Sequence, residues 1–256
     1  MEPQLLSSSI VENFIPARKS ASRKGNNGIV LVVGGSYIYH GAPVLSSLAA
    51  LRCGTDLVYT CVPKINVTPT RAISPNLIVI PLVDQKLTLG AVKKLVGALP
   101  RNLHSATIGM GLAIQEKNSL LHLVQSLLNR DVRLSLDASA LIPEVLPLLA
   151  NKNVVVTPHA GEFKRLFGDA PSDSKNERIQ LVEKHALDNG VTILLKGPTD
   201  IISNGNTTYL CQKNTPAMTV GGTGDVLSGL VAGLLSNNRN SLESAAAAAF
   251  ICGLTG

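Results

Sequence analysis

The sequence predicts an α/β fold: a mostly parallel sheet covered by helices on both faces, with one small antiparallel hairpin. Short apolar runs alternate with segments of helical length along most of the 256 residues. Nearly continuous apolar strands of this kind are typical of parallel sheets that are buried on both sides. The stretch DIISNGNTTYL breaks the alternation, because Asn204 and Gly205 lie between two strand-like runs and have the composition of a tight hairpin turn.

The expected elements follow one another from residue 28 to residue 235. Strands are expected in GIVLVVGG (28–35), TDLVYTCV (55–62), NLIVIPL (76–82), SATIG (105–109), DVRLSLD (131–137), NVVVTPH (153–159) and VTILLKG (191–197). Helices are expected in GAPVLSSLAALRCG (41–54), LTLGAVKKLVGAL (87–99), NSLLHLVQSLLNR (118–130), SKNERIQLVEKHALDNG (174–190) and DVLSGLVAGLL (225–235). The sequence has no internal repeat and no linker rich in Pro, Gly or Ser, so it predicts one domain over residues 1–256, with residues 1–23 as an N-terminal arm.

Composition narrows the class of protein. Hydrophobic residues make up 45% of the chain, which can fill a sizeable core. The opening residues MEPQLLSSSI lack the basic start and apolar run of an export signal, and no stretch approaches the ~18 apolar residues of a membrane span. No C-x-x-C pair occurs, which favours reduced core thiols over metal ligands or disulfides at Cys53, Cys61, Cys211 and Cys252. We therefore expect a cytoplasmic protein without a membrane partner.

The charge balance suits an anionic ligand. The chain carries a formal net charge of +6, which fits either nucleic acid or small phosphorylated molecules. The densest basic cluster, Arg18, Lys19, Arg23 and Lys24, precedes the first strand and has no aromatic residues between its charges. Because base stacking needs such aromatics, the cluster predicts a solvated arm and no nucleic-acid partner.

Five loops at predicted strand ends or helix starts are unusual. They are GGSYIYHGAP, GMGL, TPHAGE, KGPTD and GGTGD, and ligands of parallel sheets collect beyond the carboxyl ends of the strands. Standard fingerprints are missing from them. The sequence has no G-x-x-x-x-G-K-[ST], and GMGLAI has only the first two glycines of G-x-G-x-x-G, so Walker and dinucleotide Rossmann sites are excluded. The absence of H-E-x-x-H and G-x-S-x-G disfavours zinc and serine hydrolases.

The GGTGD stretch has the properties of a phosphate cradle. Gly221, Gly222 and Gly224 let backbone N–H groups approach an anion, and the helix that follows carries partial positive charge at its N-terminus. Asp225 has two interpretations at this point. It either stabilises the helix dipole, or it removes a proton from a hydroxyl that attacks a phosphoryl group.

Seven stretches, in order, resemble the motifs of the ADP/ATP-dependent NAD(P)H-hydrate dehydratases, a family with a ribokinase-like fold. They are KGNNGIVLVVGGS, YHGAPVLSSLAALRCGTDLVY, IGMGL, LDASAL, VVVTPHAGEFKRL, ILLKGPTD and MTVGGTGDVLSGLVAGLL. The G-T-G-D motif alone would indicate only the wider superfamily of small-molecule kinases. The GAP and TPHAGE motifs favour the dehydratases. The family normally continues for another helical segment after AAAAAFICGLTG, so we expect a short or truncated C-terminal end.

The resemblance implies a repair reaction. NADH or NADPH that has taken up water at its nicotinamide ring is dehydrated, while the terminal phosphoryl group of ADP or ATP activates the ring hydroxyl and then leaves as phosphate. Mg²⁺ is the implied metal, carried with the nucleotide, and we assign no protein residue as a metal ligand. A separate NAD(P)H-hydrate epimerase is the implied functional partner, and a homo-oligomer is the expected assembly.

The resemblance also assigns residues. Its hydrate-binding positions correspond to Ala42, Gly111, His159 and Asp225, with Asp225 as the catalytic base. Its nucleotide-binding positions correspond to Lys196, Gly197, Pro198, Thr199 and Asp200, together with Gly222, Thr223 and Gly224.

Four of the polar residues in these loops have simpler explanations as well. Lys196 either offers positive charge to phosphate or extends along the sheet edge to solvent. His159 either contacts the substrate amide or pyrophosphate or is structural, and we do not expect it to be the base. Glu162 is also explained by capping a helix. Asp137 either positions magnesium or water, or caps the helix that follows it.

Two other functions remain at this stage. The first is a kinase of a small alcohol such as a vitamin precursor, which would use the same G-T-G-D aspartate. The second is a non-catalytic nucleotide sensor, whose expected mark would be loss of Asp225 or Lys196. TPHAGE and HGAP favour the dehydratase over the kinase.

Overall fold

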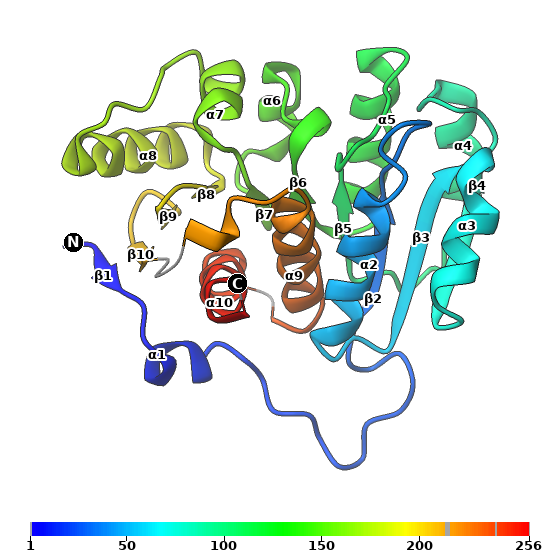
Figure 1. The fold of residues 1–256 in the computed structure, drawn as a ribbon, viewed down its shortest axis with the longest axis horizontal. Helices are drawn as coiled ribbons and strands as arrows, with labels where there is room; N and C mark the ends of the chain where they lie inside the picture. The colour runs from blue at the N-terminus through cyan, green and yellow to red at the C-terminus, as the bar shows by residue number, and fades with distance from the viewer. Residues whose placement is uncertain (1, 213–215, 239, 256) are drawn as a thin grey trace.

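A computed structural model describes residues 2–212, 216–238 and 240–255. In that part of the chain, one sheet of ten strands runs in the order β1-β10-β9-β8-β7-β6-β5-β2-β3-β4 (Figure 1). The strands are β1 (Gln4–Leu5), β2 (Ile29–Val33), β3 (Leu57–Pro63), β4 (Leu77–Leu82), β5 (Ser105–Ile108), β6 (Arg133–Leu136), β7 (Val154–Val156), β8 (Thr192–Leu195), β9 (Thr199–Ser203) and β10 (Thr208–Gln212). Neighbours from β8 through β4 are parallel, and β9 is antiparallel to both β8 and β10. The predicted α/β class with its antiparallel hairpin is confirmed.

Helices cover both faces of the sheet, as Figure 1 shows. The helices are α1 (Ser8–Glu12), α2 (Ala42–Arg52), α3 (Val67–Ile73), α4 (Leu89–Ala98), α5 (Lys117–Leu128), α6 (Leu146–Leu149), α7 (Ala160–Phe167), α8 (Lys175–Asn189), α9 (Thr223–Asn237) and α10 (Ser241–Thr255). Helices α2, α9 and α10 pack on one face, and α4, α5 and α8 pack on the other. Within the described ranges, no helix combines the length and apolarity that a membrane crossing would need.

Strand β2 shows why its sequence is apolar at every position. Side chains alternate between the two faces of a strand, so Val30 and Val32 enter the core under α2 and α9, while Leu31 and Val33 enter the core under α4 and α5. All four are fully buried. A strand that lies between two helical layers has no position at which a polar side chain would reach water.

Helices α2 and α9 meet backbone to backbone. A Cβ at Gly229 would lie 2.1 Å from the main-chain oxygen of Ser46, and a Cβ at Gly233 would lie 2.8 Å from the Cβ of Cys53. Glycine is therefore the residue that fits at both positions of α9. The hydroxyls of Ser46 and Ser228 lie 3.3 Å apart in the same buried contact.

The N-terminal segment is more than an arm, which corrects the prediction for residues 1–23. Strand β1 pairs in parallel with β10, and the N–H of Leu6 donates to the carbonyl of Leu210. Val11 of α1 is buried beneath α10. A strand of two residues is too short to give the periodic signal from which the other strands were predicted. The four basic residues from Arg18 to Lys24 are exposed, as expected.

The hairpin connection is the tight turn that Asn204 and Gly205 predict, because the N–H of Asn204 donates to the carbonyl of Thr207 at 3.3 Å. Residues 204–207 join β9 to β10, and Oδ1 of Asn204 accepts hydrogen bonds from the N–H groups of Asn206 and Thr207. Gly205 has φ +89°, and a Cβ there would also lie 2.7 Å from Leu187. The Asn-Gly pair makes this turn, and the side-chain hydrogen bonds of Asn204 stabilise it.

Candidate active site

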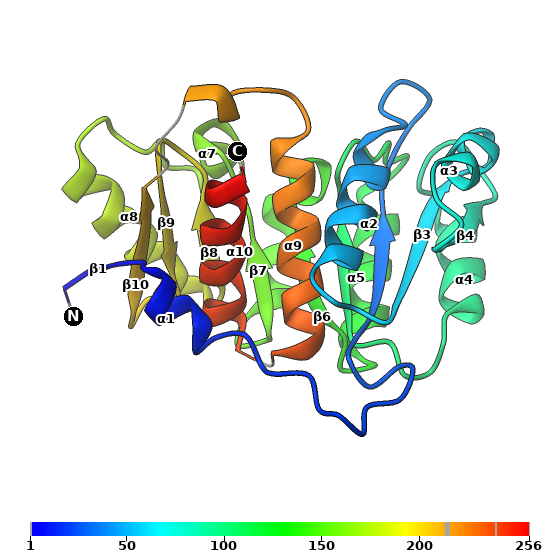
Figure 2. The same ribbon diagram turned by 60° about the horizontal axis from the view of Figure 1, so that its bottom comes forward.

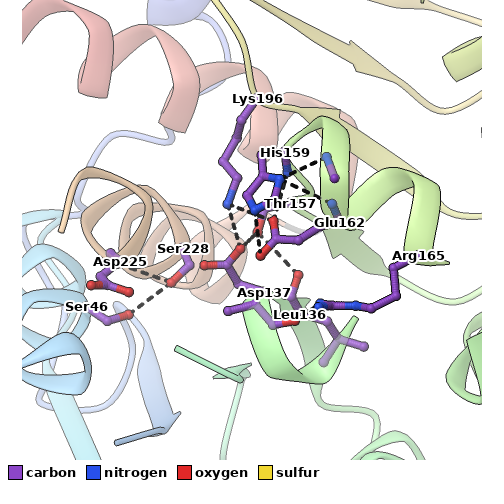
Figure 3. Close-up of polar contacts among 12 residues, drawn as sticks. Ser46, Leu136, Asp137, Thr157, His159, Glu162, Arg165, Lys196, Asp225 and Ser228 are labelled. Atoms are coloured by element: carbon purple, nitrogen blue, oxygen red, sulfur yellow. Dashed lines mark hydrogen bonds and ion pairs between the residues drawn. The ribbon is translucent and has the colours of Figure 1, made fainter. Parts of the chain in front are cut away.

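The loops that follow β2, β5, β7 and β8 meet the N-terminus of α9 at one edge of the sheet, which is the upper edge in Figure 2. This is the carboxyl edge of the parallel strands, where the sequence places its unusual loops. Figure 3 shows the polar side chains that converge there from the loops directly after β6, β7 and β8 and from the first turns of α7 and α9.

A pocket of about 380 Å³ brings together three of the four predicted hydrate-binding residues: Ala42, Gly111 and Asp225. Gly111 has φ +62°, and a Cβ there would lie 2.6 Å from the Cβ of Tyr39. Glycine is therefore needed for this loop to approach Tyr39 so closely. The pocket is also lined by residues that sequence reasoning did not assign: Ser36, Tyr39, Leu112, Ala113, Ala138 and Ser139. Ser36 and Tyr39 lie inside the GGSYIYHGAP loop, whose unusual composition could have identified them as pocket residues.

Asp225 lies in the first turn of α9, with Gly222 as the N-cap at φ +99°. Burial raises the pKa of the Asp225 carboxyl to about 6; repulsion from Asp137 also raises it, and attraction to Lys196 offsets part of the rise. The hydroxyl of Ser228 donates to the main-chain oxygen of Asp225, 3.1 Å away (Figure 3). Among the described residues, no hydrogen bond or ion pair is found for the Asp225 carboxylate, so it can accept a proton from a ligand.

Lys196 is held by two carboxylates. Its Nζ donates to Oδ1 of Asp137 at 2.9 Å and lies 3.5 Å from Oε2 of Glu162, and only 17% of its side chain is exposed (Figure 3). Burial alone would lower the pKa of Lys196, but the charges and hydrogen bonds of Asp137 and Glu162 raise it above its ordinary value. Lys196 is therefore a fixed cation, and the sheet-edge alternative, with a solvated ammonium, is wrong.

Asp137 does not cap the turn that follows it. It occupies the N-cap position of residues 138–140 without a side-chain capping hydrogen bond. Instead, its Oδ1 accepts from Lys196 and from the hydroxyl of Thr157 at 2.9 Å. The capping interpretation is wrong, and Thr157 is a partner that sequence reasoning missed. Arg165 holds the adjoining turn by donating to the carbonyl of Ala138 at 2.7 Å.

His159 and Glu162 form a capping box at the start of α7. Nδ1 of His159 accepts from the N–H groups of Gly161 and Glu162, and Oε2 of Glu162 accepts from the N–H of His159 at 2.9 Å. The structural explanations of both residues are thus confirmed, and Glu162 has a second role as a partner of Lys196. His159 lies outside the lining of the 380 Å³ pocket.

The predicted nucleotide residues fall into two groups. A Cβ at Gly224 would lie 3.5 Å from Nζ of Lys196, so the start of α9 and Lys196 are adjacent. Pro198 and Thr199 instead line a separate pocket of about 270 Å³, together with Arg178 of α8.

Asp200 and Thr223 shape the backbone around this region. Buried Asp200 accepts from the N–H of Gly197 at 2.9 Å and so fixes the KGPTD turn. The hydroxyl of Thr223 donates to the carbonyls of Met218 and Val220 and thereby holds the glycine-rich loop before α9. Across residues 2–212, 216–238 and 240–255, the structure contains no group of three or more His, Cys, Asp or Glu side chains placed to hold a metal ion.

Comparison with known proteins gives a consistent result. The family model described as NAD(P)H-hydrate dehydratase matches residues 30–256. The ADP-dependent (S)-NAD(P)H-hydrate dehydratase of Nitrosopumilus maritimus is 80% identical over all 256 residues, which correspond to 89% of that protein.

Solved structures agree with this assignment. The ADP/ATP-dependent NAD(P)H-hydrate dehydratase of Bacillus subtilis, co-crystallised with ATP/Mg²⁺, superposes with a TM-score of 0.85 at 26% identity over 99% of this chain and 88% of that one. A ribokinase-like superfamily protein of Enterococcus faecalis superposes with a TM-score of 0.81 at 25% identity over 98% of this chain and 86% of that one. The chain therefore has a ribokinase-like fold and belongs to the NAD(P)H-hydrate dehydratase family.

Proposed function

We propose that this chain dehydrates hydrated NADH and NADPH back to the reduced nucleotides, with ADP as the phosphoryl donor. The observation that carries the proposal is the position of Asp225. Its carboxylate, with a pKa of about 6, lines the 380 Å³ pocket and belongs to the glycine-flanked turn beside Lys196. The similarity to an ADP-dependent dehydratase supports the choice of ADP.

The chemistry follows from that position. Asp225 accepts the proton of the ring hydroxyl as the hydroxyl oxygen attacks the terminal phosphorus of ADP, and the bond from that phosphorus to AMP breaks. The new phosphate ester is a good leaving group. Its carbon–oxygen bond then breaks, the neighbouring ring carbon gives a proton to the departing phosphate, and the ring double bond forms as inorganic phosphate is released. The net products are NADH or NADPH, AMP and phosphate.

Lys196 supplies the positive charge in this mechanism. Because Asp137 and Glu162 hold its ammonium in place, no side-chain ordering is needed when the phosphates arrive. The N-terminus of α9, opened by Gly222 and Gly224, adds backbone N–H donors from the other side. We assign Ala42 and Gly111 to the hydrate, and Lys196, Gly197, Pro198, Thr199, Asp200, Thr223 and Gly224 to the nucleotide side. His159 is assigned to the hydrate through its exposed ring edge.

Mg²⁺ is part of the proposal as an ion carried by the nucleotide phosphates. Mg²⁺ keeps several waters and takes one or two carboxylates beside phosphate oxygens. Asp137 is the carboxylate that would fit this requirement, because it lies beside Lys196 and leaves Asp225 free to act as the base. When bound, the ion would neutralise charge on the transferred phosphoryl group.

The assembly and its partner are further parts of the proposal. A separate NAD(P)H-hydrate epimerase is the expected functional partner, since it would interconvert the two hydrate stereoisomers before dehydration. A homo-oligomer is the expected form in solution.

The test is incubation of the purified protein with NADH hydrate and either ADP or ATP. We expect the nicotinamide absorbance to recover only in the presence of nucleotide, with one AMP and one phosphate released per NADH when ADP is used. A small-molecule kinase would leave the hydrate unchanged or would accumulate a stable phosphorylated product. Either of those outcomes would contradict the proposal.

A further inference from the structure

A second polar hollow lies beneath residues 16–27, which we call the arm segment. Figure 2 shows this segment crossing the end of the sheet opposite to the start of α9. The hollow has two parts, whose linings share Arg18, Lys19 and Ser22. The basic part, of about 590 Å³, is lined by Arg18, Lys19, Arg23 and Lys24 above Asp56. The mixed part, of about 480 Å³, includes Asn26, Asn27, Cys53 and Asn237.

Asp56 holds the arm segment in place and is fully engaged in doing so. Its carboxylate accepts from the N–H of Gly25 at 2.7 Å and of Asn27 at 3.0 Å, and it also pairs with the guanidinium of Arg18. Burial alone would raise the pKa of Asp56, but these hydrogen bonds and the Arg18 charge lower it. Gly28, which follows the arm segment, lies directly against α9: a Cβ there would lie 2.0 Å from Oγ of Ser236.

Three cations of the basic part have no carboxylate partner. Lys19, Arg23 and Lys24 are exposed, and the ion pairs found among the described residues include none of them. Two local backbone turns shape this stretch: the N–H of Ser22 donates to the carbonyl of Lys19 at 3.0 Å, and the N–H of Asn26 donates to that of Arg23 at 2.9 Å. Like charges on one short segment repel one another, so an anion with several charges would relieve the repulsion.

The mixed part is lined by hydrogen-bond acceptors and apolar groups in addition to Arg18 and Lys19. Cys53 is the C-cap of α2, and Asn237 is the last residue of α9, so the carboxyl ends of two helices face it. Helix carboxyl ends present carbonyl groups that accept hydrogen bonds. The apolar side chains of Pro16 and Ala17 complete the lining. A ligand that fits both parts needs a polyanionic end and, beside it, an apolar group with hydrogen-bond donors.

We propose that the arm segment binds a nucleoside di- or triphosphate, with the phosphates on the basic part and the base in the mixed part. This site is distinct from the active site. Asp225 and Asn237 lie at opposite ends of α9, and a helix of 15 residues spans about 22 Å. The proposal does not depend on the function proposed for the carboxyl edge of the sheet.

Hydrogen exchange with ATP tests the proposal on the wild-type protein, because it reports the two sites separately. We expect ATP to slow amide exchange in residues 18–27 as well as in residues 221–226. Adenosine should protect neither segment, and inorganic pyrophosphate should protect the arm segment more weakly than ATP does. Equal protection by ATP and pyrophosphate would overturn the assignment of the base, and no protection of residues 18–27 at saturating ATP would overturn the site.

Two matched triple variants separate a site from a general charge effect. The first is Lys19→Gln/Arg23→Gln/Lys24→Gln, and the control is Lys86→Gln/Lys93→Gln/Lys94→Gln, which removes the same charge from exposed positions elsewhere. The arm variant should weaken ATP binding at residues 18–27 roughly tenfold or more, since charge-assisted contacts to phosphate are the strong ones. It should leave protection of residues 221–226 unchanged.

Equal losses in the two triples would overturn the proposal. Failure of the proposed function would look different, because protection would then be missing at residues 221–226 instead. Protection of the arm segment in the wild-type protein should also weaken as salt is raised, and this measurement needs no variant. Salt-independent protection would contradict a site built on these cations.

Discussion

The ammonium of Lys196 lies 2.9 Å from the carboxylate of Asp137, and both groups influence Asp225 in opposite directions. Asp137 raises the pKa of Asp225 and Lys196 lowers it. The two members of this ion pair together set the basicity of the proposed catalytic carboxylate.

Asp225→Asn should abolish turnover without loss of folding. Removal of a general base lowers kcat by on the order of 10²–10⁴-fold, while affinity for ADP should stay the same or improve slightly because one negative charge has gone. Turnover of NADH hydrate and calorimetric ADP binding on the same sample check this. A well-folded variant with near-normal turnover would rule out Asp225 as the base and leave only its effect on the helix dipole, which is worth roughly 0.3–1 kcal/mol.

The acid limb of the pH profile should reflect Asp225. Because the carboxylate must be ionised to accept a proton, kcat/KM should fall as pH drops through about 6. Asp137→Asn removes a repelling charge and should move this limb to lower pH. A limb that stays in place in Asp137→Asn would contradict the coupling between the two carboxyls.

The titration of Asp225 should also affect stability, but stability should fall with rising pH where activity increases. The folded-state pKa of Asp225 is raised above its unfolded value of 3.8, so the folded protein holds more protons between these values and the free energy of unfolding falls as pH rises from about 4 to about 6. In Asp225→Asn this contribution should disappear. Denaturant unfolding of both proteins across that range measures the difference, and parallel curves would show that Asp225 is not strained in the folded state.

Lys196→Gln should damage both stability and catalysis. Asp137 and Glu162 would be left buried without their cation, and breaking a buried pair costs roughly 3–5 kcal/mol; we expect roughly 2–4 kcal/mol here, since 17% of the Lys196 side chain is exposed. The double variant Lys196→Gln/Asp137→Asn should recover part of the stability but none of the activity. Full recovery of activity would exclude a role for the lysine charge.

Gly224→Val should impair ADP binding far more than folding. A Cβ at Gly224 makes only ordinary contact with Lys196, at 3.5 Å, so the fold can accept a side chain whose branches would then occupy the space beside the ammonium. Calorimetric ADP binding and thermal unfolding should be compared with Gly97→Val, at a position on α4 with open space. Equal losses of stability and ADP affinity at Gly224 would indicate a structural glycine.

His159 can be separated into its two assigned roles. His159→Ala removes the cap of α7 and should cost roughly 0.5–2 kcal/mol of stability, whereas His159→Asn keeps a capping oxygen and should cost much less. Both variants lack the imidazole, so both should raise KM for the hydrate. If His159→Asn restores KM as well as stability, the residue only caps the helix.

The sequence predicted the strands and the loops that form this edge far better than it predicted the contacts between them. Residues 29–33 and the G-T-G-D turn are local patterns, and the structure contains both where they were expected. The network of Asp137, Thr157 and Lys196 joins the ends of three strands. For Asp137, helix capping was an equally good local explanation, and only its contacts with residues distant in the sequence exclude capping. Strand β1 was missed because two residues carry no periodicity.

The close contact between α2 and α9 places a further constraint on the chemistry. Ala42 begins α2, and Asp225 lies in the first turn of α9, so two walls of the 380 Å³ pocket are carried by helices whose separation is set at Gly229 and Gly233. The lack of side chains at these two glycines sets how closely the two helices approach each other. A single added methyl at Gly229, deep in the protein and touching no ligand, would widen the gap across which proton transfer must occur. Genetic screens for inactive variants should therefore recover Gly229 alongside Asp225.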